Sequence, residues 1–81
     1  MSFNNWLDTF ISEKNINLDE SFEVEGPNYG TNYMRIINVI HAIKETSCDE
    51  QSAIKNQLVK LDFYNQPIEP FIKHLAQAIA L

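Results

Sequence analysis

The chain has 81 residues, of which 44% are hydrophobic and 21% are charged, and its formal net charge is -5. The apolar content is too high and the charge too low for intrinsic disorder, so the composition predicts one small globular domain over residues 1–81. No apolar run approaches the roughly 20 residues of a membrane-spanning helix, so we expect no membrane interaction. The sequence starts without the basic and apolar regions of a secretory signal, and we expect a cytoplasmic protein.

The first predicted element is an amphipathic helix over residues 2–15. Ser2 is a typical N-cap residue, and Asn15 is typical of the left-handed position that ends a helix. Apolar residues recur at intervals of three and four, which places them on one helix face. The residues on this face are Phe3, Trp6, Leu7, Phe10 and Ile11.

Residues 17–32 predict an acidic loop between the first and second helices. Acids crowd together in this segment, and turn-forming residues follow at 26–30. Only residues 22–25 alternate with the period of a strand, and an isolated strand needs a partner. The best candidate for that partner is 59–63, although this segment also continues a helical pattern.

A second helix is predicted from a cap at Thr31 or Asn32 to about Thr46. Its middle is rich in isoleucine and valine, which would also suit a strand. The residues expected to face inward are Tyr33, Ile36, Ile37, Ile40 and Ile43.

A third helix is predicted to begin at Ser47, which forms the pattern of a capping box with Glu50. Asn65 and Pro67 mark its end. Its expected apolar stripe is Ala53, Ile54, Leu58 and Leu61.

The fourth helix is predicted to begin at Pro67 or Ile68, because Pro70 is tolerated only in a first turn. Glu69 and Lys73 stand four residues apart, in the order that favours an ion pair. The expected buried face is Ile68, Phe71, Ile72, Leu75, Ala76 and Ile79.

These elements predict a mainly α fold, a compact bundle of about four short helices with the acidic loop, and its possible short strand, between the first two helices. The expected core is Phe3, Trp6, Phe10, Ile37, Ile40, Ile54, Leu58, Leu61, Phe71, Ile72, Leu75 and Ile79.

No motif predicts catalysis, a metal site or a cofactor. Cys48 is the only cysteine, which excludes an intramolecular disulfide, and with His41 and His74 it matches no metal-ligand spacing. Acidic neighbours of Cys48 oppose an activated thiolate. We therefore expect a protein that is not an enzyme and that has no catalytic residue, metal ligand or cofactor.

Charge is unevenly distributed along the chain. The acids of residues 1–34 exceed the bases by five, whereas residues 35–81 are balanced. No basic face is visible for phosphate contacts, so we expect no direct binding to nucleic acid. The residues of this acidic region that we expect to bind a partner are Glu13, Asp19, Glu20, Glu23, Glu25, Tyr29 and Tyr33.

The favoured hypothesis is a module that binds another protein with a basic surface through its acidic N-terminal loop. In size and charge the chain is similar to the small acidic accessory proteins of phages and plasmids. One alternative is thus an inhibitor that blocks a nucleic-acid-binding defence protein by acidic mimicry. Another is a homodimeric structural module that associates through its C-terminal helix, because residues 75–81 are apolar on more than one helix face.

Overall fold

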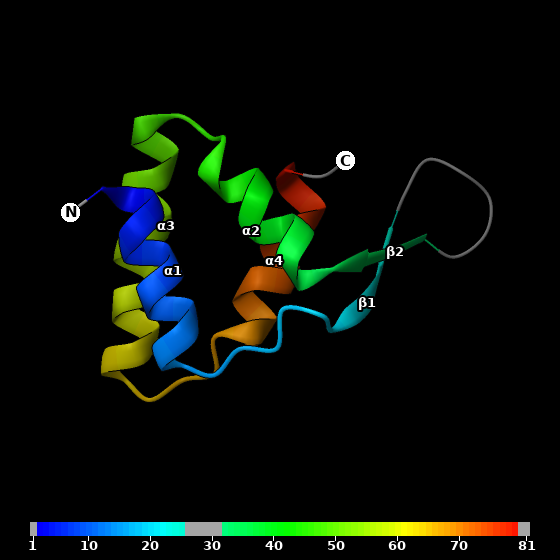
Figure 1. Cartoon of the computed structure of the whole chain (residues 1–81), viewed down its shortest axis with the longest axis horizontal. Helices are drawn as coiled ribbons and strands as arrows, with labels where there is room; N and C mark the ends of the chain where they lie inside the picture. The colour runs from blue at the N-terminus through cyan, green and yellow to red at the C-terminus, as the bar shows by residue number, and fades with distance from the viewer. Residues whose placement is uncertain (1, 26–31, 80–81) are drawn as a thin grey trace.

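The computed structural model describes residues 2–25 and 32–79, and within them it contains four helices and one two-stranded antiparallel sheet. The mainly α prediction is confirmed, with a short hairpin added between the first two helices (Figure 1). The elements in chain order are α1 (Phe3–Glu13), β1 (Ser21–Val24), β2 (Asn32–Arg35), α2 (Ile36–Lys44), α3 (Cys48–Phe63) and α4 (Glu69–Ile79).

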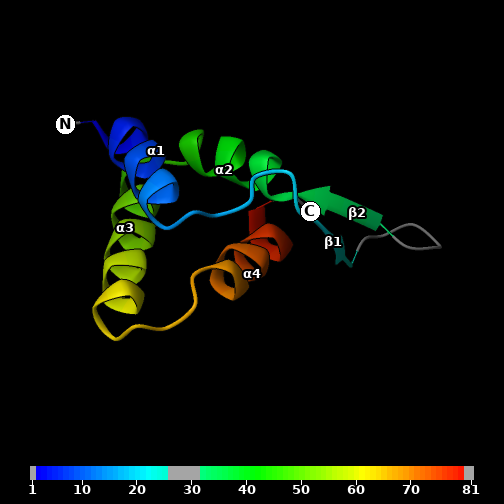
Figure 2. The same cartoon turned by 60° about the horizontal axis from the view of Figure 1, so that its bottom comes forward.

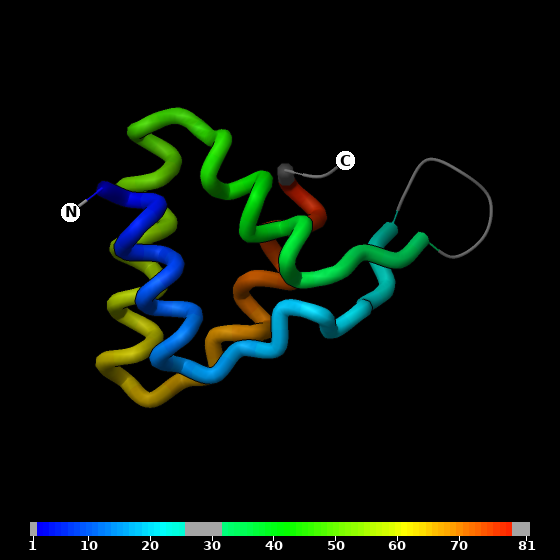
Figure 3. The backbone as a smooth tube through the Cα atoms, in the orientation of Figure 1, coloured from blue at the N-terminus to red at the C-terminus, as the bar shows by residue number. Residues whose placement is uncertain are grey.

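The helices lie in two neighbouring pairs, and the hairpin extends from one end of the molecule. Helices α1 and α3 lie side by side in both views, whereas α2 contacts α4 (Figures 1 and 2). The backbone trace shows the hairpin running away from the α1 and α3 pair (Figure 3). All four helices contribute to one core, and its largest side chains with less than 2% exposure are Leu7, Ile36, Val39, Ile43, Leu58 and Ile72.

The predicted ends of α1 and α3 are confirmed. The Ser2 hydroxyl accepts from the Asn5 amide at 3.2 Å, which satisfies a first-turn donor of α1. The Ser47 hydroxyl accepts from the Glu50 amide at the same distance. Asn15 and Asn65, which follow the two helices, have positive φ values of 54° and 55°, a conformation that asparagine tolerates better than most residues.

The second strand and the start of α2 differ from the prediction. β1 pairs with β2, with Ser21 opposite Arg35, whereas the predicted partner segment 59–63 lies within α3. Asn32 therefore begins a strand and caps no helix, and Thr31 lies outside the described residues. Residues 59–63 form the last turns of α3, and Leu61 among them packs against the core three residues after the buried Leu58.

A backbone cap determines where α2 begins. Arg35 at the N-cap position makes no side-chain capping bond. Instead, the Ile36 amide donates to the Glu20 carbonyl at 3.0 Å, and the Ile37 amide donates to the Leu18 carbonyl at 2.9 Å. Carbonyls of the acidic segment thus satisfy donors that a helix N-terminus leaves without intrahelical partners. Capping-residue chemistry could not locate this start, because both acceptors lie far away in the sequence.

Several side-chain predictions are also corrected. Tyr33 was expected to face inward but is 71% exposed, because alternation along β2 turns it outward. Ala53 is exposed on α3, and Ile37 is only half-buried. Lys73 pairs with Glu20 at 3.0 Å rather than with Glu69.

The core contains two valines that the prediction left out, Val24 and Val39, at 5% and 0% exposure. Pro70 lies in the first turn of α4, as expected, although the helix begins at Glu69. Phe3, Trp6, Leu61, Phe71 and Leu75 were predicted as core and are partly buried against it. The predicted burial of Ile79 lies outside what the structure describes.

We expect the Ser47→Ala substitution to lower the free energy of unfolding by about 1 kcal/mol, because it leaves a first-turn amide of α3 without its acceptor. Urea unfolding should show a lower midpoint with an unchanged slope. Ser52→Ala is the matched control, since Ser52 is exposed in the same helix and alanine is a strong helix former. Equal losses in the two variants would contradict a capping role.

The backbone cap of α2 also predicts a hydrogen-exchange pattern. First-turn amides usually exchange quickly, but those of Ile36 and Ile37 have acceptors. We expect their protection factors to exceed those of Cys48 and Asp49, the first two amides of α3, by roughly tenfold or more. Exchange measured by NMR and corrected for intrinsic rates checks this, and similar protection at the two helix starts would refute the cap.

Candidate functional site

The structure divides the predicted acidic site into separate parts. Glu13 ends α1, whereas Glu23 lies on β1, and α1 and the hairpin are at different ends of the molecule (Figure 1). Asp19 lies in the connector between them and Glu25 follows β1, and all four of these acids are exposed. The acids therefore do not form one continuous patch.

Lys73 neutralises one of the predicted acids, Glu20. Its Nζ atom lies 3.0 Å from Glu20 Oε2, and each side chain is 37% exposed. The Oε2 atom itself is shielded from solvent and makes no hydrogen bond within the described structure, so the contact is an ion pair without hydrogen-bond geometry. A partner gains little from Glu20, because a lysine already compensates its charge.

Two of the predicted residues come together on the hairpin. Glu23 on β1 lies directly opposite Tyr33 on β2, and both are exposed. Because side chains alternate along each strand, they share the outward side with the exposed residues Ser21 and Arg35. We call these four residues the outer hairpin face. Tyr29, the other predicted aromatic anchor, lies outside the described residues.

The inward side of the hairpin attaches it to the helices. Val24 is buried, and Phe22 and Met34 pack against the core cluster. The Lys73 ammonium also lies 5.9 Å from the centre of the Phe22 ring, a cation–π distance. The Glu25 amide donates to Gln77 Oε1 at 3.2 Å, which ties the end of β1 to α4. The hairpin thus presents its outer face from a fixed position.

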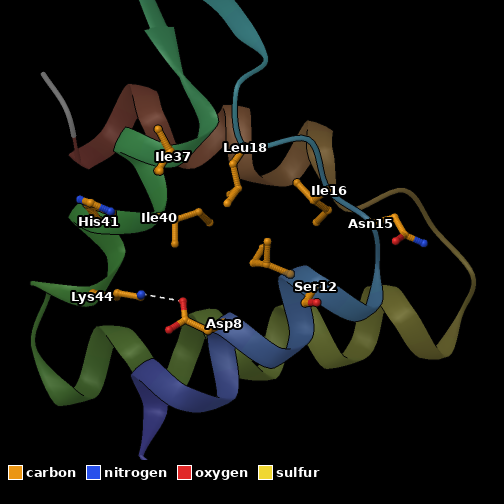
Figure 4. A pocket seen from close by; sticks show the side chains of 10 residues that line it. Asp8, Ser12, Asn15, Ile16, Leu18, Ile37, Ile40, His41 and Lys44 are labelled. Atoms are coloured by element: carbon orange, nitrogen blue, oxygen red, sulfur yellow. Dashed lines mark hydrogen bonds and ion pairs between the residues drawn. The ribbon is translucent and has the colours of Figure 1, made fainter.

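A pocket of about 630 Å³ lies between α1, α2 and the connector that follows α1 (Figure 4). Its volume is within the range of about 300 to 1,000 Å³ that is typical of ligand sites. Sequence reasoning missed it, although two apolar residues at the start of the connector after α1, Ile16 and Leu18, were a signal. Ile16 is buried in the core, whereas Leu18 packs against it and remains half-buried beside the concave surface. The lining residues are Asp8, Ile11, Ser12, Asn15, Ile16, Leu18, Ile37, Ile40, His41 and Lys44, named below the α1–α2 pocket.

An ion pair stands on one wall of the α1–α2 pocket. Lys44 Nζ donates to Asp8 Oδ1 at 2.6 Å, and Figure 4 shows this contact joining α2 to α1. The exposure of the two side chains differs, with 60% for Asp8 and 23% for Lys44. The carboxylate is therefore the more accessible of the two charges.

Exposed apolar side chains gather near the C-terminal end of α3. Val59 and Phe63, one helical turn apart, are 49% and 76% exposed, and Tyr64 just beyond the helix is 61% exposed. The Phe63 and Tyr64 rings meet edge to face at 5.1 Å. The predicted self-association surface is residues 75–81, of which Ala76 is buried, Leu75 is half-buried and Ala78 is exposed, whereas the side chains of 79–81 lie outside what the structure describes. Among the described residues, the exposed large apolar side chains on the helices and their ends are thus those of Val59, Phe63 and Tyr64.

Chemistry-bearing side chains are dispersed in the described part of the chain. His41, His74 and Cys48 are exposed, and within residues 2–25 and 32–79 no three potential metal ligands gather. None of the helices in those ranges has the length and apolar content that crossing a membrane requires.

Comparison of the chain with protein-family models, with curated proteins and with solved structures found no match.

Proposed function

We propose that this protein is a small, non-enzymatic module that binds another protein through its outer hairpin face and the neighbouring acids. The observation that carries this proposal is the exposure of Tyr33, which is 71% accessible on a strand and directly opposite Glu23. A tyrosine with so much exposed surface, fixed by backbone pairing, is suited to anchor a partner.

The fixed position of Tyr33 supports its role as an anchor. Its strand, β2, pairs with β1, and the chain continues from the end of β2 directly into the capped start of α2. Little backbone freedom would then be lost on binding, and reduced ordering cost favours affinity. Tyrosine also has few rotatable bonds for its contact area, which lowers the side-chain entropy cost.

The charges around Tyr33 favour a basic partner. Asp19, Glu23 and Glu25 are exposed, and the described structure contains no ion pair with any of them. The negative field of such acids raises the rate of encounter with a basic surface. Arg35 lies on the outer hairpin face together with Glu23. The face therefore carries one positive and one negative charge at different positions.

The positions of the acidic side chains favour a protein-binding module over acidic mimicry of nucleic acid. A mimic needs a rigid run of uncompensated negative charges that replaces a row of phosphates. Here Glu20 is compensated by Lys73, and Glu13 lies apart from the hairpin at the end of α1. The remaining acids support steering and local contact with a protein surface.

Affinity capture from a lysate of the native host tests the proposal. We expect the double variant Glu23→Gln with Tyr33→Ser to recover the partner at roughly a tenth of the unmodified level or less, measured by quantitative mass spectrometry. Glu20 is left unchanged in this variant because its ion pair with Lys73 joins the connector to α4.

A matched control removes the same two side-chain types elsewhere. Glu50→Gln with Tyr64→Ser changes an exposed acid and an exposed tyrosine on α3 and just beyond its end. This control should recover the partner normally. If both double variants lose it equally, or if neither does, the outer hairpin face is not the binding surface.

Self-association through α3 is a second candidate function, favoured by the exposed side chains of Val59, Phe63 and Tyr64. Burial of an exposed phenylalanine between two copies would remove apolar surface from water. It would also supplement the small core of a chain of this length.

Sedimentation velocity over a range of concentrations tests this second candidate. We expect a concentration-dependent dimer in the unmodified protein and a strict monomer for Phe63→Ser. Tyr33→Ser, which removes an exposed aromatic ring from the hairpin, should leave the dimer unchanged. A monomeric unmodified protein at tens of micromolar would remove the candidate.

A further inference from the structure

Glu20 is the residue at which the connector after α1, the hairpin and two helices meet. It directly precedes β1. Its backbone carbonyl accepts from the Ile36 amide at 3.0 Å and so caps α2, while its side chain pairs with Lys73 of α4 at 3.0 Å. The position of this one residue is therefore determined by α2 through its backbone and by α4 through its side chain.

Lys73 holds the start of β1 from the inward side of the hairpin. Its Nζ atom lies 3.0 Å from Glu20 Oε2 and 5.9 Å from the centre of the Phe22 ring. Residues two apart in an extended chain point to the same side, so one ammonium group can contact both. Phe22 packs against the core, and this contact is thus on the side opposite to the outer hairpin face.

The other end of β1 is attached to the same helix. The Glu25 amide donates to Gln77 Oε1 at 3.2 Å. Gln77 follows Lys73 by four residues within α4, which places the two side chains one turn apart on the same helix face. Two side chains of α4 therefore hold β1 at both of its ends, and the orientation of the hairpin depends on this helix.

Loss of the Lys73 ammonium would have a large effect on Glu20 because of one shielded atom. Glu20 Oε2 is buried from solvent and makes no hydrogen bond within the described structure, so the lysine charge is its compensation. A carboxylate oxygen that is neither hydrated nor paired is unfavourable. The side chain would have to turn toward water, and that movement would displace the carbonyl that caps α2.

We propose that Lys73 is a positioning residue for the partner site: its ammonium group, acting through Glu20, holds the outer hairpin face in the orientation that meets the partner. The inference rests on the proposed function and adds how that face is controlled from α4. When only a fraction of the molecules has the hairpin in the binding orientation, the apparent dissociation constant rises in inverse proportion to that fraction.

Lys14 offers a matched control elsewhere in the fold. Its Nζ atom lies 2.6 Å from Asp62 Oδ1 and 5.7 Å from the centre of the Phe10 ring. These are the same two types of contact that Lys73 makes, but they connect α1 with α3. Substitution of either lysine by methionine removes one positive charge and keeps most of the aliphatic stem. The two variants therefore differ mainly in whether the lost contacts adjoin the hairpin.

NMR of the full chain tests the positioning role without the partner. We expect Lys73→Met to lower the hydrogen-exchange protection of the Ile36 amide by roughly threefold to tenfold, because the acceptor of that amide is the Glu20 carbonyl. The buried Leu58 of α3 supplies a reference amide, whose protection should change less. Order parameters of the β1 amides should also fall well below the value of about 0.85 that is typical of rigid backbone.

Two further variants distinguish positioning from a general loss of stability. Lys73→Arg keeps the positive charge, and Lys14→Met removes a charge away from the hairpin. Both should leave the order of β1 and the relative protection of the Ile36 amide unchanged. Thermal unfolding midpoints of all variants check that each one folds.

A double-mutant cycle tests that Lys73 acts through Glu20. In a Glu20→Gln background, Lys73→Met should change the protection of the Ile36 amide by less than roughly twofold, because the ion pair is already broken. An equal change in both backgrounds would show that the two residues act independently and would overturn the inference.

Affinity capture then connects the hairpin to the partner. We expect Lys73→Met to recover the partner at roughly a third of the unmodified level or less, and Lys73→Arg and Lys14→Met to recover it normally. Long-range electrostatics alone predicts the opposite sign, because removal of a positive charge strengthens attraction to a basic partner. A loss of capture therefore reports the position of the hairpin.

The outcomes distinguish this inference from the proposed function. Unchanged order of β1 in Lys73→Met, or an equal loss of order in Lys14→Met, would overturn the inference and leave the hairpin proposal standing. If Lys73→Met reduces the order of β1 while capture of the partner is unaffected, the control of the hairpin by α4 stands and the proposed function fails.

Discussion

The position of the hairpin depends on two backbone hydrogen bonds at the start of α2. The amides of Ile36 and Ile37 donate to the carbonyls of Glu20 and Leu18, so the connector after α1 is attached to a helix that belongs to the core. These bonds set the direction in which β2 leaves α2 and keep Leu18 beside Ile37. The only surface tyrosine on the described strands and the floor of the pocket are thus fixed by the same contacts.

Helix existence and most helix ends could be predicted from the sequence, because they depend on local chemistry. Ser2 and Ser47 cap their helices, and Asn15 and Asn65 adopt the left-handed conformation that ends them. The start of α2 could not be predicted in this way. Its cap comes from carbonyls well separated in the sequence, and the alternation of β2 is only four residues long.

The candidate site was only partly predictable, because counting charges by sequence region does not show which charges meet. Lys44 and Lys73 belong to the electrically balanced half of the chain, yet they pair with Asp8 and Glu20 of the acidic half. Folding therefore neutralises two of the N-terminal acids with lysines from other helices, and the acids that stay exposed lie at separate places on the surface. The α1–α2 pocket likewise required tertiary structure, since its walls come from three segments.

The small size of the sheet has a consequence for how the protein behaves in a crowded solution. In the described part of the chain the sheet has only β1 and β2, so each strand has an open edge that could pair with another molecule. Each strand is four residues long. Glu23 on β1 and Arg35 on β2 place opposite charges on the outward side of the sheet. Short strands that carry charged side chains are poorly suited to fibre-like stacking, so the exposed Tyr33 lies on a strand that does not favour pairing with other molecules.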